Sequence, residues 1–137
     1  MRALFDTNVI IDIGLERHPF VIDSLNLFDF FDSGLLIGYL TATTVTDIYY
    51  LCKKELGHEK SILFIKSLLS TFEILSVDRN VILNAIEQNS LDFEDSIQSS
   101  ASEINGLDMI ITRNSKDFKS SPTRVLSPSE AIKFFSK

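Results

Sequence analysis

The sequence predicts a single α/β domain, residues 1–137, in which helices cover both faces of a parallel sheet. Short apolar segments alternate with longer segments of helical periodicity along the whole chain. This order is typical of βαβ units and of buried parallel sheets. No internal repeat, linker or low-complexity segment divides the chain, and its length suffices for one proper core.

The first forty residues are expected to form two strands and two helices. Arg2 to Phe5 is a short apolar run, and the Asp6-Thr7-Asn8 that follows is typical of a turn or a helix N-cap. A helix then runs from Asn8 to about Leu15. Another begins at Pro19, which suits a first helical turn, and ends near Ser33-Gly34. The second strand is Leu35 to Leu40.

The central part of the chain predicts two helices and a third strand. The spacing Thr44-x-x-Asp47 resembles a capping box, which would place Asp47 in the first turn of a helix. Gly57 is expected to end that helix. Apolar residues at helical spacing predict a further helix from His58 to Phe72, and Glu73 to Val77 follows as the third strand.

Two more helices are expected before the fourth strand. Asp78 suits the N-cap of the first of them, which Asn89-Ser90 would end. The next begins at Asp92, which suits an N-cap, and stops at Asn105-Gly106. The fourth strand is Met109 to Ile111.

The C-terminal segment predicts a short turn, a fifth strand and a last helix. The turn is Ser115 to Phe118, and the strand is Thr123 to Leu126. Ser127-Pro128-Ser129-Glu130 combines an N-cap, a proline at the first helical position and a capping acid.

Composition excludes several classes of protein. A net charge of −6 argues against holding nucleic acid by bulk electrostatics, although phosphate could still be met through bound cations. The single cysteine, Cys52, excludes an internal disulfide, and two distant histidines make a zinc site improbable. We expect no membrane span and no signal peptide, and therefore a cytoplasmic protein.

Several acids are expected at one edge of the sheet. Asp6 follows the first strand, Asp47 the second, and Asn114 and Asp117 the fourth, while the helix that opens at Asp92–Asp95 leads back into the fourth strand. In right-handed βαβ units, the carboxyl end of a strand and the start of the next helix share an edge. Each acid alone could be a helix cap or a dipole partner.

Clustered carboxylates repel one another unless a cation lies between them. Oxygen ligands without His or Cys suit magnesium or manganese. An ion held in this way typically polarises a phosphate and generates a hydroxide nucleophile. The acids therefore predict a metal site for Mg²⁺ or Mn²⁺.

The order and spacing of these motifs resemble a PIN-domain protein, most closely the VapC-type toxin nucleases of type II toxin–antitoxin modules. Phe5-Asp6-Thr7-Asn8, Asp92-Phe93-Glu94-Asp95 and Ile111-Thr112-Arg113-Asn114-Ser115-Lys116-Asp117-Phe118 carry the resemblance. It implies a five-stranded sheet of order 3-2-1-4-5 and a Mg²⁺- or Mn²⁺-dependent endoribonuclease. It also implies an RNA substrate, frequent homodimers and an inhibiting antitoxin protein.

The resemblance also assigns site residues. The catalytic acids would be Asp6, Asp47, Asp95 and Asp117, with Asp6, Asp95 and Asp117 as metal ligands. The supporting residues would be Asn8, Asp92, Thr112 and Asn114. The family usually has Glu at the second acidic position, so Asp47 is shorter by one methylene. Asp92 is an additional acid, either a second ligand or an N-cap.

Two other interpretations compete with the nuclease. One is a catalytically weak PIN module that acts through protein binding, using apolar residues in excess of what the core needs. These residues are Phe20, Leu27, Phe28, Phe31, Leu68 and Leu69. The other is a receiver-like or phosphatase-like domain phosphorylated on Asp6, although the second Asp of the phosphatase pattern is missing. Cationic residues at the rim would contact phosphate or remain solvated surface. They are Lys53, Lys54, Arg113, Lys116 and Lys119.

Overall fold

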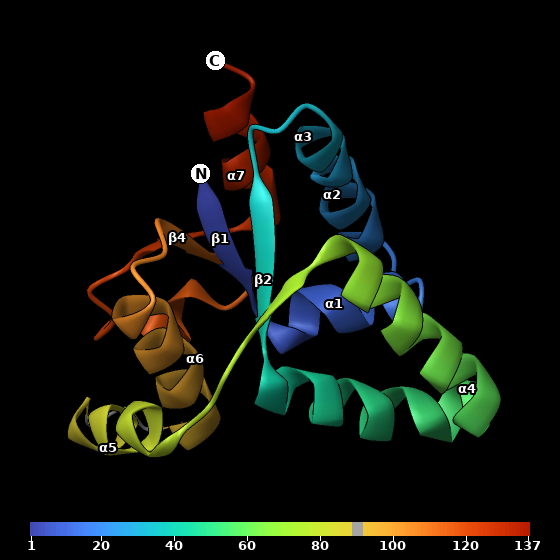
Figure 1. The fold of residues 1–137 in the computed structure, drawn as a ribbon. Coiled ribbons are helices and arrows are strands. Elements are labelled where there is room, and N and C mark those ends of the chain that lie inside the picture. Colours follow the sequence, from blue (N-terminus) through green and yellow to red (C-terminus); the bar gives the residue numbers. More distant parts are fainter. Residues whose placement is uncertain (89–91) are drawn as a thin grey trace.

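The computed structural model describes residues 1–88 and 92–137, and these contain a five-stranded sheet. Figure 1 shows how the helices are arranged around it. The strands are β1 (Arg2–Phe5), β2 (Ile37–Thr41), β3 (Glu73–Leu75), β4 (Met109–Ile111) and β5 (Arg124–Leu126). All neighbouring pairs are parallel, and the order is β3-β2-β1-β4-β5. The predicted sheet and its order are confirmed.

Helices connect the strands and cover both faces. They are α1 (Thr7–Gly14), α2 (Phe20–Asn26), α3 (Phe28–Asp32), α4 (Ala42–Thr71), α5 (Arg79–Glu87), α6 (Phe93–Ile104), the short 3₁₀ helix η1 (Ser115–Phe118) and α7 (Pro128–Phe135). In Figure 1, α5 and α6 lie on one side of the central strands, and α1 to α4 lie on the other. No helix in the described ranges is both long and apolar enough to cross a membrane.

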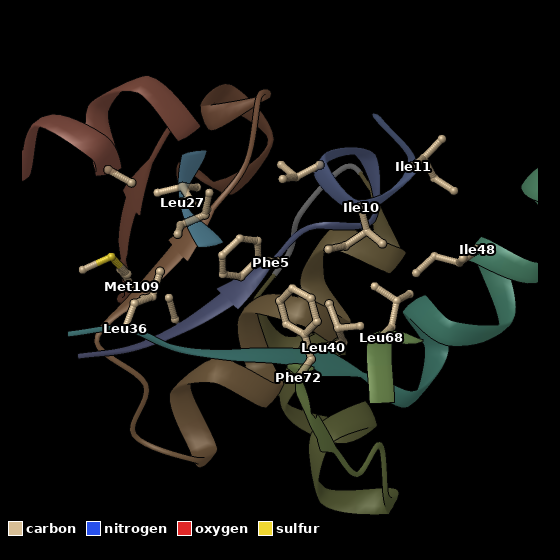
Figure 2. Close-up of a cluster of buried hydrophobic side chains, with 14 of the residues drawn as sticks. Phe5, Ile10, Ile11, Leu27, Leu36, Leu40, Ile48, Leu68, Phe72 and Met109 are labelled. Atoms are coloured by element: carbon tan, nitrogen blue, oxygen red, sulfur yellow. The ribbon is translucent and has the colours of Figure 1, made fainter. Parts of the chain in front are cut away.

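The alternation of side chains along the strands divides the core into two clusters. Ala3 and Phe5 of β1 belong to one cluster, beneath α1, α4 and α7, whereas Leu4 between them belongs to the other, beneath α5 and α6. Figure 2 shows the first cluster, in which the ring of Phe5 lies near that of Phe72 with centroids 5.1 Å apart. Both faces of β1 are therefore buried, which places its carboxyl end inside the domain.

Close packing against β2 explains a glycine in that strand. A Cβ built on Gly38 would lie 2.7 Å from the ring of Phe72 and 2.8 Å from that of Phe31. Glycine at this position lets both rings pack directly on the backbone of the strand.

Some predicted boundaries were wrong. The helix predicted from Pro19 to near Ser33-Gly34 ends there, but it is broken at Leu27 into α2 and α3, and Pro19 lies just before α2 rather than in its first turn. β2 begins at Ile37 instead of Leu35, and β3 ends at Leu75 instead of Val77. The predicted helix stop at Asn89-Ser90 lies outside the described residues.

The start of α4 also differs from the prediction. Thr41, not Thr44, is the N-cap, and its hydroxyl accepts a hydrogen bond from the Thr44 backbone N–H at 3.2 Å. Three threonines precede Val45, and each could serve as the N-cap. Thr41 takes this position because β2 ends there. Asp47 therefore lies in the second helical turn, beyond the reach of a capping box. Gly57 interrupts α4 with φ +81°, which agrees with the predicted helix end there.

The apolar residues predicted to exceed the needs of the core fall into two groups. Leu27 and Leu68 are core residues, with 0% and 4% of their surface exposed. Phe28 and Phe31 are partly buried against the same cluster. Within this set the exposed side chains are Phe20 and Leu69, so the predicted surface was overestimated.

Candidate functional site

Asp6 lies at the carboxyl end of β1 and at the N-cap position of α1, but it does not cap that helix. Its side chain is 5% exposed, and both of its oxygens are engaged elsewhere. Oδ1 accepts a hydrogen bond from Nε2 of Gln98 at 2.9 Å, and Oδ2 accepts one from Oγ1 of Thr112 at 2.7 Å. The interpretation of Asp6 as a simple capping residue therefore has no support in the geometry.

Burial raises the pKa of Asp6 above its ordinary value, and the charge of Asp117 adds to the rise. The hydrogen bonds from Thr112 and Gln98 oppose the rise, because they stabilise the ionised carboxylate. The carboxylate is thus held in place by two donors in a setting that disfavours its charge, as at a site adapted to a cation.

Asp95 and Asp117 approach Asp6 from two other elements. Asp95 lies in the first turn of α6, and burial together with the charges of Asp6, Asp92 and Asp117 raises its pKa to about 7. Asp117 lies in η1, which follows β4. The structure thus brings Asp6, Asp95 and Asp117 into electrostatic contact at one edge of the sheet.

Asp47 has a partner that the sequence did not reveal. Its carboxyl shares a hydrogen bond with Glu94, and this bond is the largest cause that raises the pKa of Glu94 to about 8, ahead of burial and nearby charge. Glu94 stands inside the acidic motif that begins at Asp92, but the pairing of α4 with α6 that brings it to Asp47 is tertiary.

Polar residues around the acids hold them in place. Thr112 is fully buried and also accepts a hydrogen bond from the Asn114 backbone N–H at 3.0 Å. The structure gives Asn114 a backbone role beside Thr112, and within residues 1–88 and 92–137 its side chain makes no hydrogen bond to a carboxylate. Gln98 was missed, although it lies one turn after Asp95, a spacing that places two residues on one helix face.

The remaining predicted supporting residues lie in the first turns of α1 and α6. Asn8 is half-buried, and its Oδ1 has no hydrogen-bond partner. Asp92 is the N-cap of α6, and its carboxylate accepts hydrogen bonds from the backbone N–H groups of Glu94 and Asp95. Of the two predicted roles for Asp92, the structure shows the N-cap.

Arg113 does not serve as a free cation at the rim. Its guanidinium donates to both carboxylate oxygens of Asp12, at 2.5 and 3.2 Å, and stacks over the ring of Phe20 at 4.0 Å. Asp12 is completely buried in α1, so Arg113 neutralises a charge that has left water. By contrast, Lys116 remains exposed beside Asp117, where η1 and the preceding loop line a hollow of about 500 Å³.

The chemistry of the donor set fits a hard divalent cation. The carboxyl groups of Asp6, Asp95 and Asp117 offer only oxygen atoms, and Oε1 of Gln98, on the amide that bonds Asp6, is buried without a donor. Among the described residues, no three His, Cys, Asp or Glu side chains are yet spaced to hold one ion. Side chains such as that of Asp117, which is exposed, would have to turn inward to share one.

Comparison with known proteins agrees with this arrangement. Residues 2–116 match the PIN domain family, so the chain belongs to the PIN domain family. The match covers three of the acids and both donors to Asp6, and it ends one residue before Asp117. No curated protein matches the chain.

The fold is similar to solved toxin–antitoxin proteins. A toxin–antitoxin complex from Klebsiella pneumoniae is 25% identical, with a TM-score of 0.70 and coverage of 92% of this chain and 97% of that one. VapBC2 from Rickettsia felis, bound to a DNA fragment from its promoter, is 17% identical, with a TM-score of 0.74 and coverage of 93% and 98%.

A third structure is the Mycobacterium tuberculosis VapC20, described as a sarcin–ricin loop cleaving toxin. It is 12% identical, with a TM-score of 0.65, and covers 79% of this chain and 86% of that one. At such identities the likeness shows the fold alone. The predicted resemblance to VapC-type toxins is confirmed at that level.

The raised pKa values lead to a prediction for stability without metal. Asp6, Glu94 and Asp95 have folded pKa values above their ordinary ones, to about 8 for Glu94 and about 7 for Asp95. The folded state therefore binds more protons than the unfolded state between about pH 4 and pH 8. We expect the free energy of unfolding in EDTA to fall as the pH rises through this window, measured by denaturant titration.

Manganese or magnesium should reverse that loss at neutral pH. An ion bound only by the folded state stabilises it by about 2.7 kcal/mol at a hundredfold excess over Kd, or by roughly 5–10 °C in melting temperature. A melt of the wild-type protein that is indifferent to both ions and flat with pH would contradict the assignment of these acids to a cation site.

Proposed function

We propose that this protein is a metal-dependent endoribonuclease and the toxin of a toxin–antitoxin pair acting in the cytoplasm. The observation that carries the proposal is the electrostatic convergence of Asp6, Asp95 and Asp117 at one sheet edge of a PIN domain. Apolar strands have no structural need to deliver acids to one place, and the mutual repulsion is costly without a cation.

The proposed roles follow from the contacts. Asp6 and Asp95 would hold Mg²⁺ or Mn²⁺, and Asp117 would complete the site. Thr112 and Gln98 fix the direction of the Asp6 carboxylate from both sides. The ion, when bound, would polarise the phosphate and lower the pKa of a water. Asp47, bonded to Glu94, would position that water rather than hold the ion directly.

We take RNA as the substrate because the chain belongs to the PIN domain family and resembles the VapC-type toxin nucleases, and the M. tuberculosis relative is described as a sarcin–ricin loop cleaving toxin. The test is incubation of the protein with total RNA and with single-stranded DNA in the presence of Mn²⁺, and again with EDTA. We expect RNA cleavage that EDTA abolishes. Cleavage that persists in EDTA, or cleavage of DNA alone, would reject the proposal.

A weak PIN module that acts through protein binding remains the second candidate, because two observations favour it. Asp47 is shorter than the family's usual acid, and its carboxyl is engaged with Glu94. No three-ligand group is preformed within the described residues. The same assay separates the candidates: no cleavage at any metal concentration, together with stable binding of a partner protein, would favour the binding module.

Exposed apolar side chains on α2 and α4 favour a homodimer or an antitoxin complex through these helices. These side chains are Phe20, Ile22, Leu25, Leu63 and Leu69. We expect light scattering to show a dimer that Leu25→Glu weakens. Ile104→Glu is the matched control, because Ile104 is equally exposed but lies on α6. A wild-type monomer at high concentration that ignores the cognate antitoxin would contradict this expectation.

A further inference from the structure

A second feature adjoins the acids and has no part in holding the ion. It is a groove of about 300 Å³ between α5 and α6, with apolar walls formed by Val77, Ile82, Phe93 and Ile97. The ring of Phe93 is 53% exposed and Ile82 is 40% exposed, whereas Ile97 is buried at 5%. A half-exposed aromatic ring over a buried aliphatic floor is a surface on which a flat apolar group can stack.

Carboxyl groups close one side of the same groove. Asp47 and Glu94, the hydrogen-bonded pair, are among its lining residues. Carboxyl oxygens beyond the one bond that the pair shares are left to accept from a ligand. The groove therefore combines a stacking wall with acceptors at its edge, and it offers no cation to a phosphate.

The first turn of α6 connects this groove to the acidic cluster. Phe93 and Ile97 are four residues apart and share the face that lines the groove, while Glu94 turns to Asp47 and Asp95 to Asp6. Glu94 lines the groove and is followed directly by Asp95 of the candidate metal site, so the two features adjoin within one helical turn. Because Glu94 and Asp95 are consecutive, a strand with a phosphate at Asp95 would pass beside the groove.

From this geometry we infer that the groove is a nucleobase subsite, which takes one unstacked base of the substrate strand next to the phosphate that is cleaved. The base stacks on Phe93, and its exocyclic amine donates to the carboxyl oxygens of Asp47 and Glu94. Adenine and cytosine carry such an amine and uracil does not, so the subsite favours the former. The inference rests on the proposed function for the identity of the strand.

Neutral nucleosides test the subsite without a metal, a phosphate or catalysis. Adenosine, cytidine and uridine are titrated into the wild-type protein while isoleucine methyl resonances are followed by NMR. We expect the Ile82 and Ile97 methyls to shift with adenosine and cytidine, and clearly less with uridine. Ile86 lies one turn after Ile82 on α5, is 61% exposed and does not line the groove, so its methyl should stay in place.

Variants extend the test. Phe93→Ala should weaken the nucleoside shifts, and so should Ile82→Ala, whereas Ile86→Ala should not. In cleavage assays, removing the base beside the cleaved phosphate should lower kcat/KM about 5- to 100-fold for the wild type, the range expected from one stacked base, and far less for Phe93→Ala.

The outcomes separate this inference from the proposed function. Shifts of the Ile82 and Ile97 methyl resonances without RNA cleavage would support the subsite and contradict the proposed nuclease function. RNA cleavage with no nucleoside shift, with equal shifts for uridine, or with unchanged titrations in Phe93→Ala would overturn the subsite. Groove variants that weaken only antitoxin binding would assign the groove to a protein side chain and would also overturn it.

Discussion

Replacing Asp6 by Asn is expected to lower RNA cleavage by about 10²- to 10⁴-fold, because a bound ion contributes several kcal/mol to the transition state. The fold should survive. Oε1 of Gln98 has no donor, so its amide can turn to accept from the new amide, and the Thr112 hydroxyl can turn in the same way. Cleavage kinetics and circular dichroism would measure both effects.

Stability distinguishes a metal ligand from a turn residue in this variant. Since burial raises the pKa of Asp6, Asp6→Asn should be more stable than the wild type in EDTA at neutral pH and should respond little to Mn²⁺. Asp29→Asn, an exposed acid on α3, is the matched control and should keep full activity. Full cleavage by the Asp6→Asn variant, or a loss of its stability in EDTA, would show that Asp6 is a turn residue and not a metal ligand.

Removing the guanidinium of Arg113 should have the largest effect on stability. Arg113→Met leaves the carboxylate of Asp12, which is 0% exposed, without its ion-pair partner. Losing one partner of a buried pair typically costs 3–5 kcal/mol, and because Arg113 is 25% exposed we expect about 2–4 kcal/mol. This is a large share of the 5–15 kcal/mol typical of a domain and should be plain in denaturant titration.

A double variant tests the cause of that loss. Asp12→Leu combined with Arg113→Met should recover much of the stability, because an apolar pair of similar volume often replaces a buried ion pair without loss. Arg79→Met, at the exposed start of α5, is the matched control and should change little. An Arg113→Met variant as stable as the control would show that water reaches Asp12.

Local patterns predicted the strands, the sheet order through the family resemblance, and most helix ends. The Ser127 capping box and the Asp78 and Asp92 N-caps depend on neighbours within three residues, and the structure has all of them. The start of α4 was wrong because several threonines could cap it equally well locally. Thr41 is the N-cap because it is the last residue of β2 that pairs with β3, and that pairing cannot be seen in the local sequence.

Side-chain contacts between residues far apart in the sequence could not be predicted from local patterns. Asp12 and Arg113 are 101 residues apart, and nothing in the local pattern around either residue pairs them. Arg113 was therefore predicted as a rim cation that contacts phosphate or stays solvated, whereas the structure pairs it with Asp12. Glu94 was passed over for a comparable reason, since its partner lies on α4 and the two helices meet only in the folded chain.

The opening turn of α6 gives three consecutive side chains three different tasks. Phe93 faces the groove, Glu94 faces Asp47, and Asp95 faces Asp6. Successive residues of a helix point about 100° apart. Inserting or deleting one residue here would therefore turn each of the three side chains away from its present partner. Substitution carries no such penalty. A substitution at Phe93 therefore changes the groove and leaves the directions of Glu94 and Asp95 unchanged.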